Sequence, residues 1–324
     1  MHSRSSLEAG RRRDTLLVSA DYFGDSICLD KIVGKNLGHD CHDPAALLEE
    51  VRRLRQELSR LTPRLAALLR RRGFYIYKKE PGDDLLLPAP RDRKGFYEMM
   101  HKYSFRLFLR DVIKYQESFT LTQVARYAGR DTARTYADYL SKIGLIKRGK
   151  SGFSLIAGRI RSFGETLEWY VSELFKQEFG CEAVWGVKFK RPSVGGDYDV
   201  IAKVDGSILY MEVKSSPPKQ IYDSEITAFM DRIDDLAPEI AVFFMDTELR
   251  MKDKIVPMFE KELAARYREP PLVKRIEREL FEIEDRVFII NAKENVSGNI
   301  EKVLYRYYRS RRRLQHENRL FCSK

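Results

Sequence analysis

The chain has 324 residues, of which 43% are hydrophobic and 33% charged, and this composition excludes a wholly disordered or collagen-like protein. No stretch approaches the roughly 18 consecutive apolar residues of a membrane span, so we expect no membrane partner. Four scattered cysteines and an N-terminus without a secretory hydrophobic core predict a cytoplasmic protein that has no disulfide framework. The length favours two domains with appendages over a single core.

The positive charge is unevenly distributed along the chain. Of the net charge of +11, residues 1–94 contribute +5, residues 95–158 contribute +6 and residues 159–324 contribute zero. Within the last stretch, residues 301–324 hold eight basic and two acidic residues, which leaves residues 159–300 at −6. An acidic block flanked by basic ones is typical of a polyanion binder with a separate site that attracts cations.

Residues 1–43 show no periodicity, and we interpret them as a loose N-terminal extension. The extension contains four potential zinc ligands, Cys28, His39, Cys41 and His42, whose spacing matches no common zinc finger. Incidental residues are therefore favoured over a zinc site.

Residues 44–96 are predicted to form a coiled-coil-like helical segment and a linker. Pro44 suits the first position of a helix, and apolar residues then follow at alternating spacings of four and three: Leu47, Val51, Leu54, Leu58, Leu61 and Leu65. This seam predicts a helix that pairs either within the chain or with a second copy in a homodimer. Pro63 should kink or split the helix, a short strand is expected over 74–77, and residues 80–96 have the composition of a linker.

The pattern of residues 97–158 resembles a winged helix-turn-helix domain. Apolar positions predict a first helix over about 98–116. Thr120 or Thr122 should open a short second helix, and Gly129 should close it. A tight turn and a longer third helix would complete the motif.

Asp131 is expected to cap the third helix and Gly144 to end it, and residues 145–156 have the pattern of a hairpin wing. The exposed side of this helix and the wing would carry residues suited to phosphate and groove contacts: Arg130, Arg134, Thr135, Lys142, Lys147, Arg148 and Lys150. We therefore predict DNA binding here, with a domain used only for protein contacts as the alternative.

From residue 159 to 300 the pattern changes to an α/β order, followed by a basic C-terminal helix or tail over 301–324. We expect a mixed sheet flanked by helices. The predicted elements are a helix over about 161–179, strands over 183–190, 197–204 and 207–214, a helix over 223–236, a strand over 240–245, a helix over 251–266 and a strand over 287–290.

Two of these strands carry polar residues where a buried sheet would not place them. Asp199 lies at the entry to one apolar strand, and Glu212 and Lys214 end the next. Residues two apart leave a strand on one face, so Glu212 and Lys214 project together while Val213 returns to the core. If the two strands pair as a hairpin, Asp199 meets Glu212, and the two carboxylates would repel each other unless a divalent cation binds between them. The alternative is an ordinary solvated ion pair.

These residues resemble the PD-(D/E)xK nuclease superfamily, because twelve residues separate Asp199 from Glu212-Val213-Lys214. The order of one helix and three strands is similar to its archaeal Holliday-junction resolvase and Mrr-like branches. The resemblance covers about 161–246 and implies a restriction-endonuclease-like fold. Tyr198 stands where the family name has proline.

The resemblance also implies a helix carboxylate before the first strand. Glu168 matches that position best, with Glu165 one turn earlier as the competitor. Asp197, on the same face as Asp199, is a rival metal ligand, and the carbonyl of Val213 would be a further ligand.

The resemblance implies that Asp199, Glu212 and Glu168 bind Mg²⁺, with Mn²⁺ as an alternative, and that Lys214 contacts the attacking water and the scissile phosphate. The leading hypothesis is a Mg²⁺-dependent DNA endonuclease whose winged helix holds the duplex. The alternatives are a DNA-binding regulatory protein with an inactive nuclease-like domain, and an RNA nuclease. The sequence shows no Walker loop and no Ser/His/Asp set, so a nucleotide hydrolase and a serine hydrolase are poor alternatives.

Overall fold

In the computed structural model of this chain, the described residues are 49–50, 53–54, 57, 62–126, 128–150, 152–190 and 194–321, with side chains described to residue 312. The chain divides into two compact units, residues 1–58 and 59–324, and nearly all described residues belong to the second. The N-terminal extension, the four residues weighed as zinc ligands and most of the leucine seam lie outside the described residues. Helix α3 (Leu65–Arg71) begins two residues after Pro63, and Leu65 is buried.

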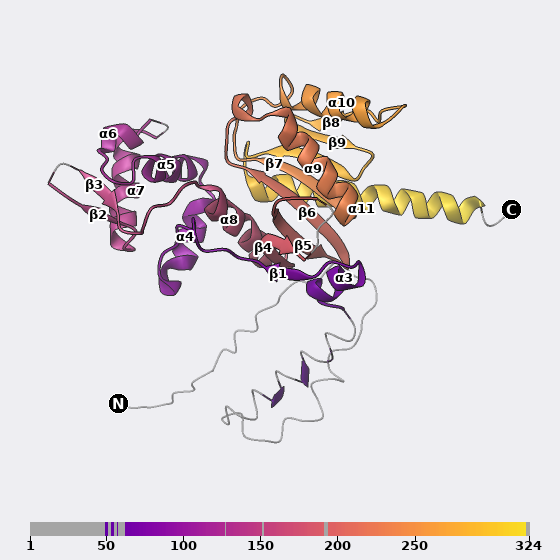
Figure 1. The fold of residues 1–324 in the computed structure, drawn as a ribbon, viewed down its shortest axis with the longest axis horizontal. Helices are drawn as coiled ribbons and strands as arrows, with labels where there is room; N and C mark the ends of the chain where they lie inside the picture. The colour runs from indigo at the N-terminus through magenta and orange to yellow at the C-terminus, as the bar shows by residue number, and fades with distance from the viewer. Residues whose placement is uncertain are drawn as a thin grey trace, which may run out of the picture. The chain divides into compact units, whose positions relative to one another are not determined.

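An eight-stranded mixed sheet forms the framework of the second unit, in the order β1-β4-β5-β6-β7-β10-β9-β8 (Figure 1). β6, β7 and β10 are parallel to one another, and every other neighbouring pair is antiparallel. The prediction of an α/β fold with a mixed sheet flanked by helices is confirmed. The strands are β1 (Ile76–Lys78), β4 (Glu182–Phe189), β5 (Tyr198–Val204), β6 (Ser207–Lys214), β7 (Ile240–Met245), β8 (Lys274–Glu277), β9 (Leu280–Ile283) and β10 (Val287–Asn291).

The two central strands, β6 and β7, run in parallel and end on the same side of the sheet. Every residue of β7 is buried, and so is every residue of β6 except Lys214. Such continuous burial fits strands that are covered on both faces. The parallel register runs from Leu209 opposite Ile240 to Lys214 opposite Met245. Residues that follow β6 and β7 are therefore neighbours.

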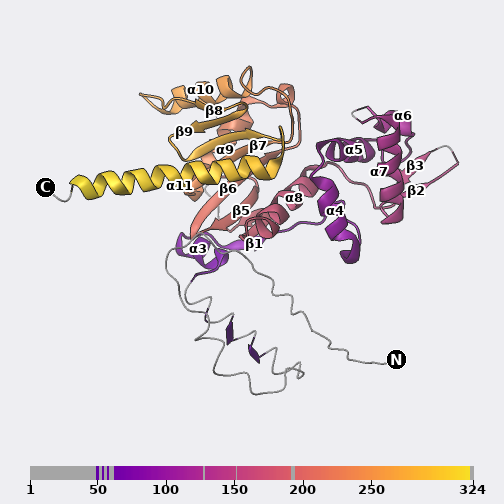
Figure 2. The same ribbon diagram turned by 180° about the vertical axis from the view of Figure 1, so that it is seen from behind.

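Helices cover both faces of the sheet. α9 (Asp223–Leu236) and α10 (Ile255–Arg266) lie over one face, in front of the sheet in Figure 1. There Phe229 and Phe259 pack edge-on against Phe243 of β7. α8 (Gly164–Gln177) and α11 (Val296–Phe321) pack on the opposite face (Figure 2). Among the described residues, no helix is both long enough and apolar enough to cross a membrane.

A helical segment precedes α8 in the chain. It comprises α4 (Arg93–Met100), α5 (Tyr103–Lys114), α6 (Leu121–Val124), α7 (Arg130–Lys142) and a hairpin of β2 (Ile146–Arg148) and β3 (Phe153–Leu155). Thr120 opens α6, because its side chain and that of Gln123 form a reciprocal capping box. The prediction that Asp131 caps the third helix is wrong: Gly129 is the N-cap of α7, and Asp131 lies in its first turn. Identification of this segment as a winged helix stays a prediction.

The prediction of a single helix over 98–116 is also wrong. Two helices, α4 and α5, span this stretch, and residues 101–102 separate them. Lys102 is extended at the break, where the guanidinium of Arg106 donates to the carbonyls of Met100 at 2.6 Å and His101 at 3.1 Å. These bonds satisfy carbonyls that a continuous helix would have paired internally. α4 also begins at Arg93, inside the stretch predicted as a linker.

The hairpin of β8 and β9 was not predicted. β8 consists of Lys274, Arg275, Ile276 and Glu277 and forms an edge of the sheet, so its sequence lacks a buried face. β9 contains the buried Glu282, which Arg306 of α11 holds by two hydrogen bonds of 2.7 and 2.8 Å. Two helix starts also differ from prediction, since α10 begins at Ile255 and α11 at Val296.

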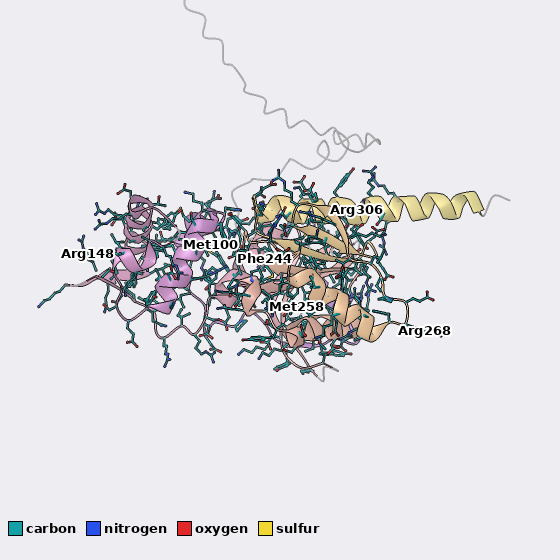
Figure 3. All side chains as sticks on the ribbon, turned by 90° about the horizontal axis from the view of Figure 1, so that it is seen from above. Met100, Arg148, Phe244, Met258, Arg268 and Arg306 are labelled. Atoms are coloured by element: carbon teal, nitrogen blue, oxygen red, sulfur yellow. The ribbon has the colours of Figure 1, made fainter. Side chains whose placement is uncertain are left out.

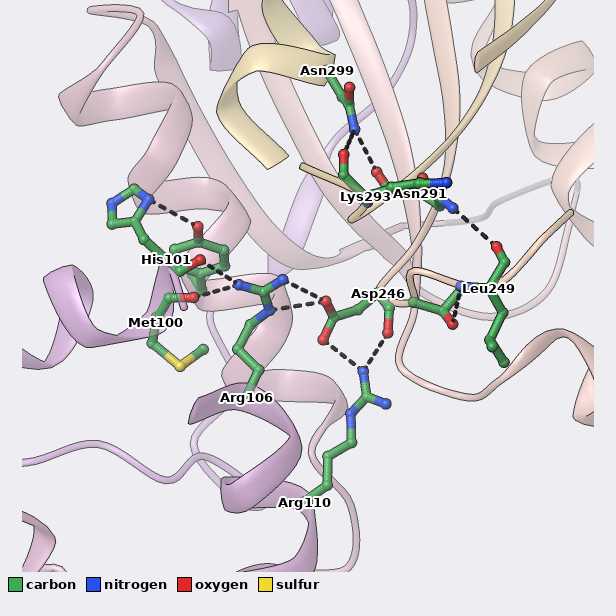
Figure 4. Close-up of polar contacts among 11 residues, drawn as sticks. Met100, His101, Arg106, Arg110, Asp246, Leu249, Asn291, Lys293 and Asn299 are labelled. Carbon is green, nitrogen blue, oxygen red and sulfur yellow. Dashed lines mark hydrogen bonds and ion pairs between the residues drawn. The ribbon is translucent and has the colours of Figure 1, made fainter. Parts of the chain in front are cut away.

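A buried ion cluster joins the helical segment to the sheet (Figure 4). Asp246, directly after β7, accepts hydrogen bonds from Arg106 at 2.8 Å and from Arg110 at 2.6 Å, both in α5. Asp246 and Arg106 are almost fully buried. The backbone N–H of Asp246 donates to the carbonyl of Lys214 at 2.8 Å. The cluster therefore fixes α5 against the ends of β6 and β7.

Candidate functional site

The start of β5 and the end of β6 bring two carboxylates together. The antiparallel register pairs Val200 with Met211, and its continuation by one residue sets Asp199 opposite Glu212. Asp199 Oδ2 accepts a hydrogen bond of 2.7 Å from the backbone N–H of Val213. Asp199 and Glu212 therefore lie side by side at the sheet edge, as the sequence predicts.

Glu212 is the most enclosed carboxylate of the site, with 3% of its surface exposed. Its Oε1 lies 2.9 Å from Lys214 Nζ, and its Oε2 lies 3.1 Å from an Arg232 guanidinium nitrogen. The hydroxyl of Tyr210 donates to the same Oε2 atom. A buried carboxylate requires such partners, since an unpaired buried charge is strongly destabilising.

Helix α9 supplies two residues that the sequence analysis missed. Glu225 contacts Lys214 Nζ at 3.0 Å, and Arg232 reaches Glu212. The two residues are seven apart, which sets them on one side of the helix. The sequence signal that could have identified them is the helical spacing of these two charged residues beside the apolar face of α9. Gly196 permits this approach, because a Cβ there would lie 2.6 Å from Arg232.

Glu168 of α8 completes the group of carboxylates and lies near Gly186 of β4. The β4–β5 register sets Gly186 opposite Asp199, and a Cβ at Gly186 would lie 3.7 Å from Glu168 Oε2 and 2.4 Å from Pro81. Gly186 also has a φ of +56°, which L side chains rarely adopt. We call Glu168, Asp199 and Glu212 the acidic cluster.

The acidic cluster favours positive charge. Burial, and then the charge of Asp199, raise the pKa of Glu168 to about 10. Burial, and then the charge of Glu212, raise the pKa of Asp199 to about 8. Burial is the largest single effect on Lys214 and opposes its protonation, but Glu212, Asp199 and Glu225 together outweigh burial and raise the pKa of this ammonium. At neutral pH, Glu168 and Asp199 therefore need a proton or a bound cation to offset their mutual repulsion.

The two rival carboxylates have other partners. Glu165 accepts a hydrogen bond of 2.9 Å from the backbone N–H of Asp84, and Asp197 pairs with Lys188 at 3.0 Å. Within the part of the chain that the structure describes, Glu168 makes no hydrogen bond or ion pair. This arrangement favours Glu168 and Asp199 over their rivals as ligands for a cation.

The donor set suits a hard divalent cation, since it consists of carboxylate oxygens. Among the described residues, no three Asp, Glu, His or Cys side chains converge as a ready-made metal site. Mg²⁺ commonly binds through one or two carboxylates, with water and substrate phosphate as the other ligands, so these residues fit it. A cation at Glu212 would compete with Lys214 or Arg232 for the same oxygens.

The residues expected to bind nucleic acid lie away from the acidic cluster, on α7 and the β2–β3 hairpin. All seven are exposed: Arg130, Arg134, Thr135, Lys142, Lys147, Arg148 and Lys150. Arg148 lies on the hairpin, well apart from Phe244 in the sheet (Figure 3). The structure therefore does not bring these residues to the carboxylates, and their role stays a prediction.

Comparison with known proteins gives two distant structural neighbours. No protein-family model matches the chain, and no curated protein matches it. Can2 from Sulfobacillus thermosulfidooxidans, solved in complex with cyclic tetra-adenylate, aligns with a TM-score of 0.37 and 19% identity over 56% of this chain and 50% of its own. Protein VC1899 from Vibrio cholerae aligns with a TM-score of 0.37 and 14% identity over 59% of this chain and 55% of its own. This chain thus spans about half the length of each neighbour, and neither alignment is strong enough to support a function.

Proposed function

We propose that this protein is a metal-dependent nuclease that hydrolyses phosphodiester bonds in DNA. The observation that carries the proposal is the acidic cluster, in which two carboxylates with raised pKa values lie beside a third carboxylate and a lysine. An arrangement of this kind destabilises the metal-free protein, because it holds carboxylates together in a site largely shielded from water. Strongly perturbed carboxylates beside a lysine are typical of a functional site.

Each residue has a role in this proposal. Asp199, Glu212 and Glu168 would hold Mg²⁺ or Mn²⁺, with the Val213 carbonyl as a further oxygen ligand. When bound, the ion would polarise a phosphate oxygen and lower the pKa of a water molecule. Lys214 would place its ammonium on the scissile phosphate and the attacking water.

Glu225 and Tyr210 would serve as positioning residues. Glu225 and Glu212 both pair with Lys214, so two carboxylates hold the ammonium. Tyr210 donates its hydroxyl proton to Glu212 Oε2 and leaves Oε1 to Lys214. Both contacts limit the rotation of the groups that would meet the substrate.

The direct test is incubation of the purified full chain with supercoiled plasmid, branched DNA and RNA, in Mg²⁺ or in EDTA. The proposal expects DNA cleavage that requires the metal. Cleavage of RNA alone would replace DNA by RNA as the substrate, and cleavage in EDTA would remove the metal from the proposal.

A second candidate is a DNA-binding regulatory protein whose nuclease-like domain is inactive. It is favoured by one observation, that Arg232 and Tyr210 already occupy Glu212 Oε2. This candidate predicts DNA binding without cleavage in any divalent metal. The substrate panel described above separates the two candidates.

A further inference from the structure

A groove of about 1150 Å³ lies between α5 and the loops that follow β6 and β7. It exceeds the roughly 1,000 Å³ that bounds most small-molecule pockets. Its walls come from α5, from residues 159–163 before α8, from residues 215–220 after β6, and from residues 247–249 after β7. No residue of α7 or of the β2–β3 hairpin that the structure describes contributes to its lining.

The lining of this groove is basic. It contains six basic residues, Arg110, Lys114, Arg126, Arg159, Arg161 and Lys219, against two acidic ones, Asp111 and Glu248. Arg110 forms an ion pair with Asp246, and Arg161 forms one with Asp84. Lys114, Arg159 and Lys219 are exposed and make no ion pair with any residue that the structure describes. Their charge is therefore available to an anionic ligand.

The other polar groups of the lining suit phosphate. Hydroxyl groups come from Ser162, Ser215 and Ser216. The aromatic residues are Tyr103, which is half-buried, and Phe163, which is buried under the guanidinium of Arg110. Hydroxyls and cations hold a sugar-phosphate backbone, whereas base stacking requires exposed rings. The groove thus suits contact with a nucleic-acid backbone and does not suit base reading.

The groove meets the acidic cluster at two points in the chain. Ser215 and Ser216 directly follow Lys214, the last residue of β6. On the other wall, Phe163 directly precedes Gly164, whose Cβ position lies 3.7 Å from Glu168 Oε1. A nucleic-acid strand that follows the groove would therefore arrive at the carboxylates of the acidic cluster.

The walls of the groove are held in place before any ligand binds. Arg110 of α5 donates to both the carboxylate and the carbonyl of Asp246, at 2.6 Å each (Figure 4). Thr247 and Glu248, the next two residues, line the opposite wall. Preorganisation of this kind lowers the entropic cost of binding.

We infer that this groove holds the phosphodiester backbone of the DNA substrate next to the cleavage site, which rests on the nuclease function proposed above. Lys114, Arg159 and Lys219 would make the phosphate contacts. The groove would then be the main substrate surface, ahead of the exposed face of α7.

The test compares two triple variants of equal charge. One removes the groove cations (Lys114→Gln, Arg159→Gln, Lys219→Gln), and the other removes exposed cations of α7 (Arg130→Gln, Arg134→Gln, Lys142→Gln). Binding of a labelled duplex of about 20 base pairs is measured in EDTA between about 50 and 200 mM salt, since each lost phosphate contact lowers the salt slope by about 1. EDTA separates binding from cleavage, so binding fails or survives independently of the proposed activity.

The inference expects the groove variant to lose about 2 to 3 units of the salt slope and at least about tenfold in affinity, with a smaller loss in the α7 variant. With Mg²⁺, the groove variant should cleave slowly at low DNA concentration and recover at saturation. If the α7 variant loses as much affinity and salt slope as the groove variant, or more, the inference is overturned. A groove variant that weakens binding of an RNA duplex of the same sequence but not of the DNA would overturn it too. Equal melting temperatures of the two variants show that both are folded.

Discussion

Arg232 of α9 lies 3.1 Å from Glu212 of β6 and thereby occupies an oxygen that a metal ion would need. Burial is the largest single effect on Arg232 and opposes its charge, but Glu212, Tyr210 and Asp199 together outweigh burial and raise the pKa of the guanidinium. The arginine therefore stays charged and, together with Lys214, stabilises Glu212 when no metal ion is bound. It acts as a built-in counterion at the acidic cluster.

Arg232→Gln should separate these two effects. The variant leaves Glu212 with one fewer cation, so we expect the metal-free protein to lose about 1–3 kcal/mol of unfolding free energy. Because the competing charge is gone, the affinity for Mg²⁺ should rise. Calorimetric titration and thermal melting with and without Mg²⁺ measure both quantities. A variant that binds Mg²⁺ more weakly than wild type would show that Arg232 does not compete with the metal.

The two helix carboxylates offer a matched pair of substitutions. Glu168→Gln should reduce cleavage by at least about tenfold, because it removes a ligand from the acidic cluster. Glu165→Gln should have a smaller effect, since Glu165 accepts a hydrogen bond from the Asp84 backbone. Single-turnover cleavage rates give the ranking. The reverse ranking would move the ligand role one turn toward the N-terminus.

Stability should depend on pH through Asp199. Burial and the neighbouring Glu212 raise the pKa of Asp199 to about 8 in the folded protein, above its value of about 3.9 in an unfolded chain. Between these values the folded state binds the extra proton, so the unfolding free energy of the metal-free protein should fall as pH rises toward 8. Asp199→Asn should lessen this slope in urea titrations, with the remainder coming from Glu168, and Mg²⁺ should reduce the slope in the wild type. An unchanged slope in the variant would contradict the assigned environment.

The buried ion cluster around Asp246 should matter for stability more than exposed ion pairs do. Asp246→Ala leaves Arg106 buried without its carboxylate, and we expect a loss of about 3–5 kcal/mol. Lys261→Gln removes one partner of an exposed pair with Asp223 and should cost far less, because solvent screens an exposed ion pair. Chemical denaturation of the two variants makes the comparison. Equal losses would mean that the cluster does not anchor α5 to the sheet.

The elements that carry the acidic cluster could be predicted because their signals are local. β6, β7 and α9 have the bounds expected from the sequence, since continuous apolar runs and helical periodicity report burial directly. The pairing of Asp199 with Glu212 follows from the period of a strand and from a short turn between β5 and β6. Where the local sequence pattern agrees with burial, residue spacing is sufficient to predict which side chains lie together.

The missing parts of the site depend on contacts between distant segments. Glu225 reaches Lys214, and Arg232 reaches Glu212, only because α9 packs across β6 and β7, and local sequence pattern does not report that packing. The requirement for glycine at position 186 arises from Pro81, which lies far from it in the chain. In the same way, the contact of the Arg106 side chain with the end of α4 is one that periodicity does not report.

The central claim is that the acidic cluster cleaves DNA with a metal ion, and two neighbouring aspartates test it most directly. Cleavage of supercoiled plasmid in Mg²⁺ is measured for the wild type, for Asp199→Asn and for Asp197→Asn as the matched control. We expect Asp199→Asn to lose activity by about 100-fold or more with DNA binding intact, because the site loses an electrostatic group that the reaction needs. Asp197→Asn should stay close to wild type, since Asp197 pairs with Lys188 outside the cluster. Wild-type levels of cleavage by Asp199→Asn would contradict the account.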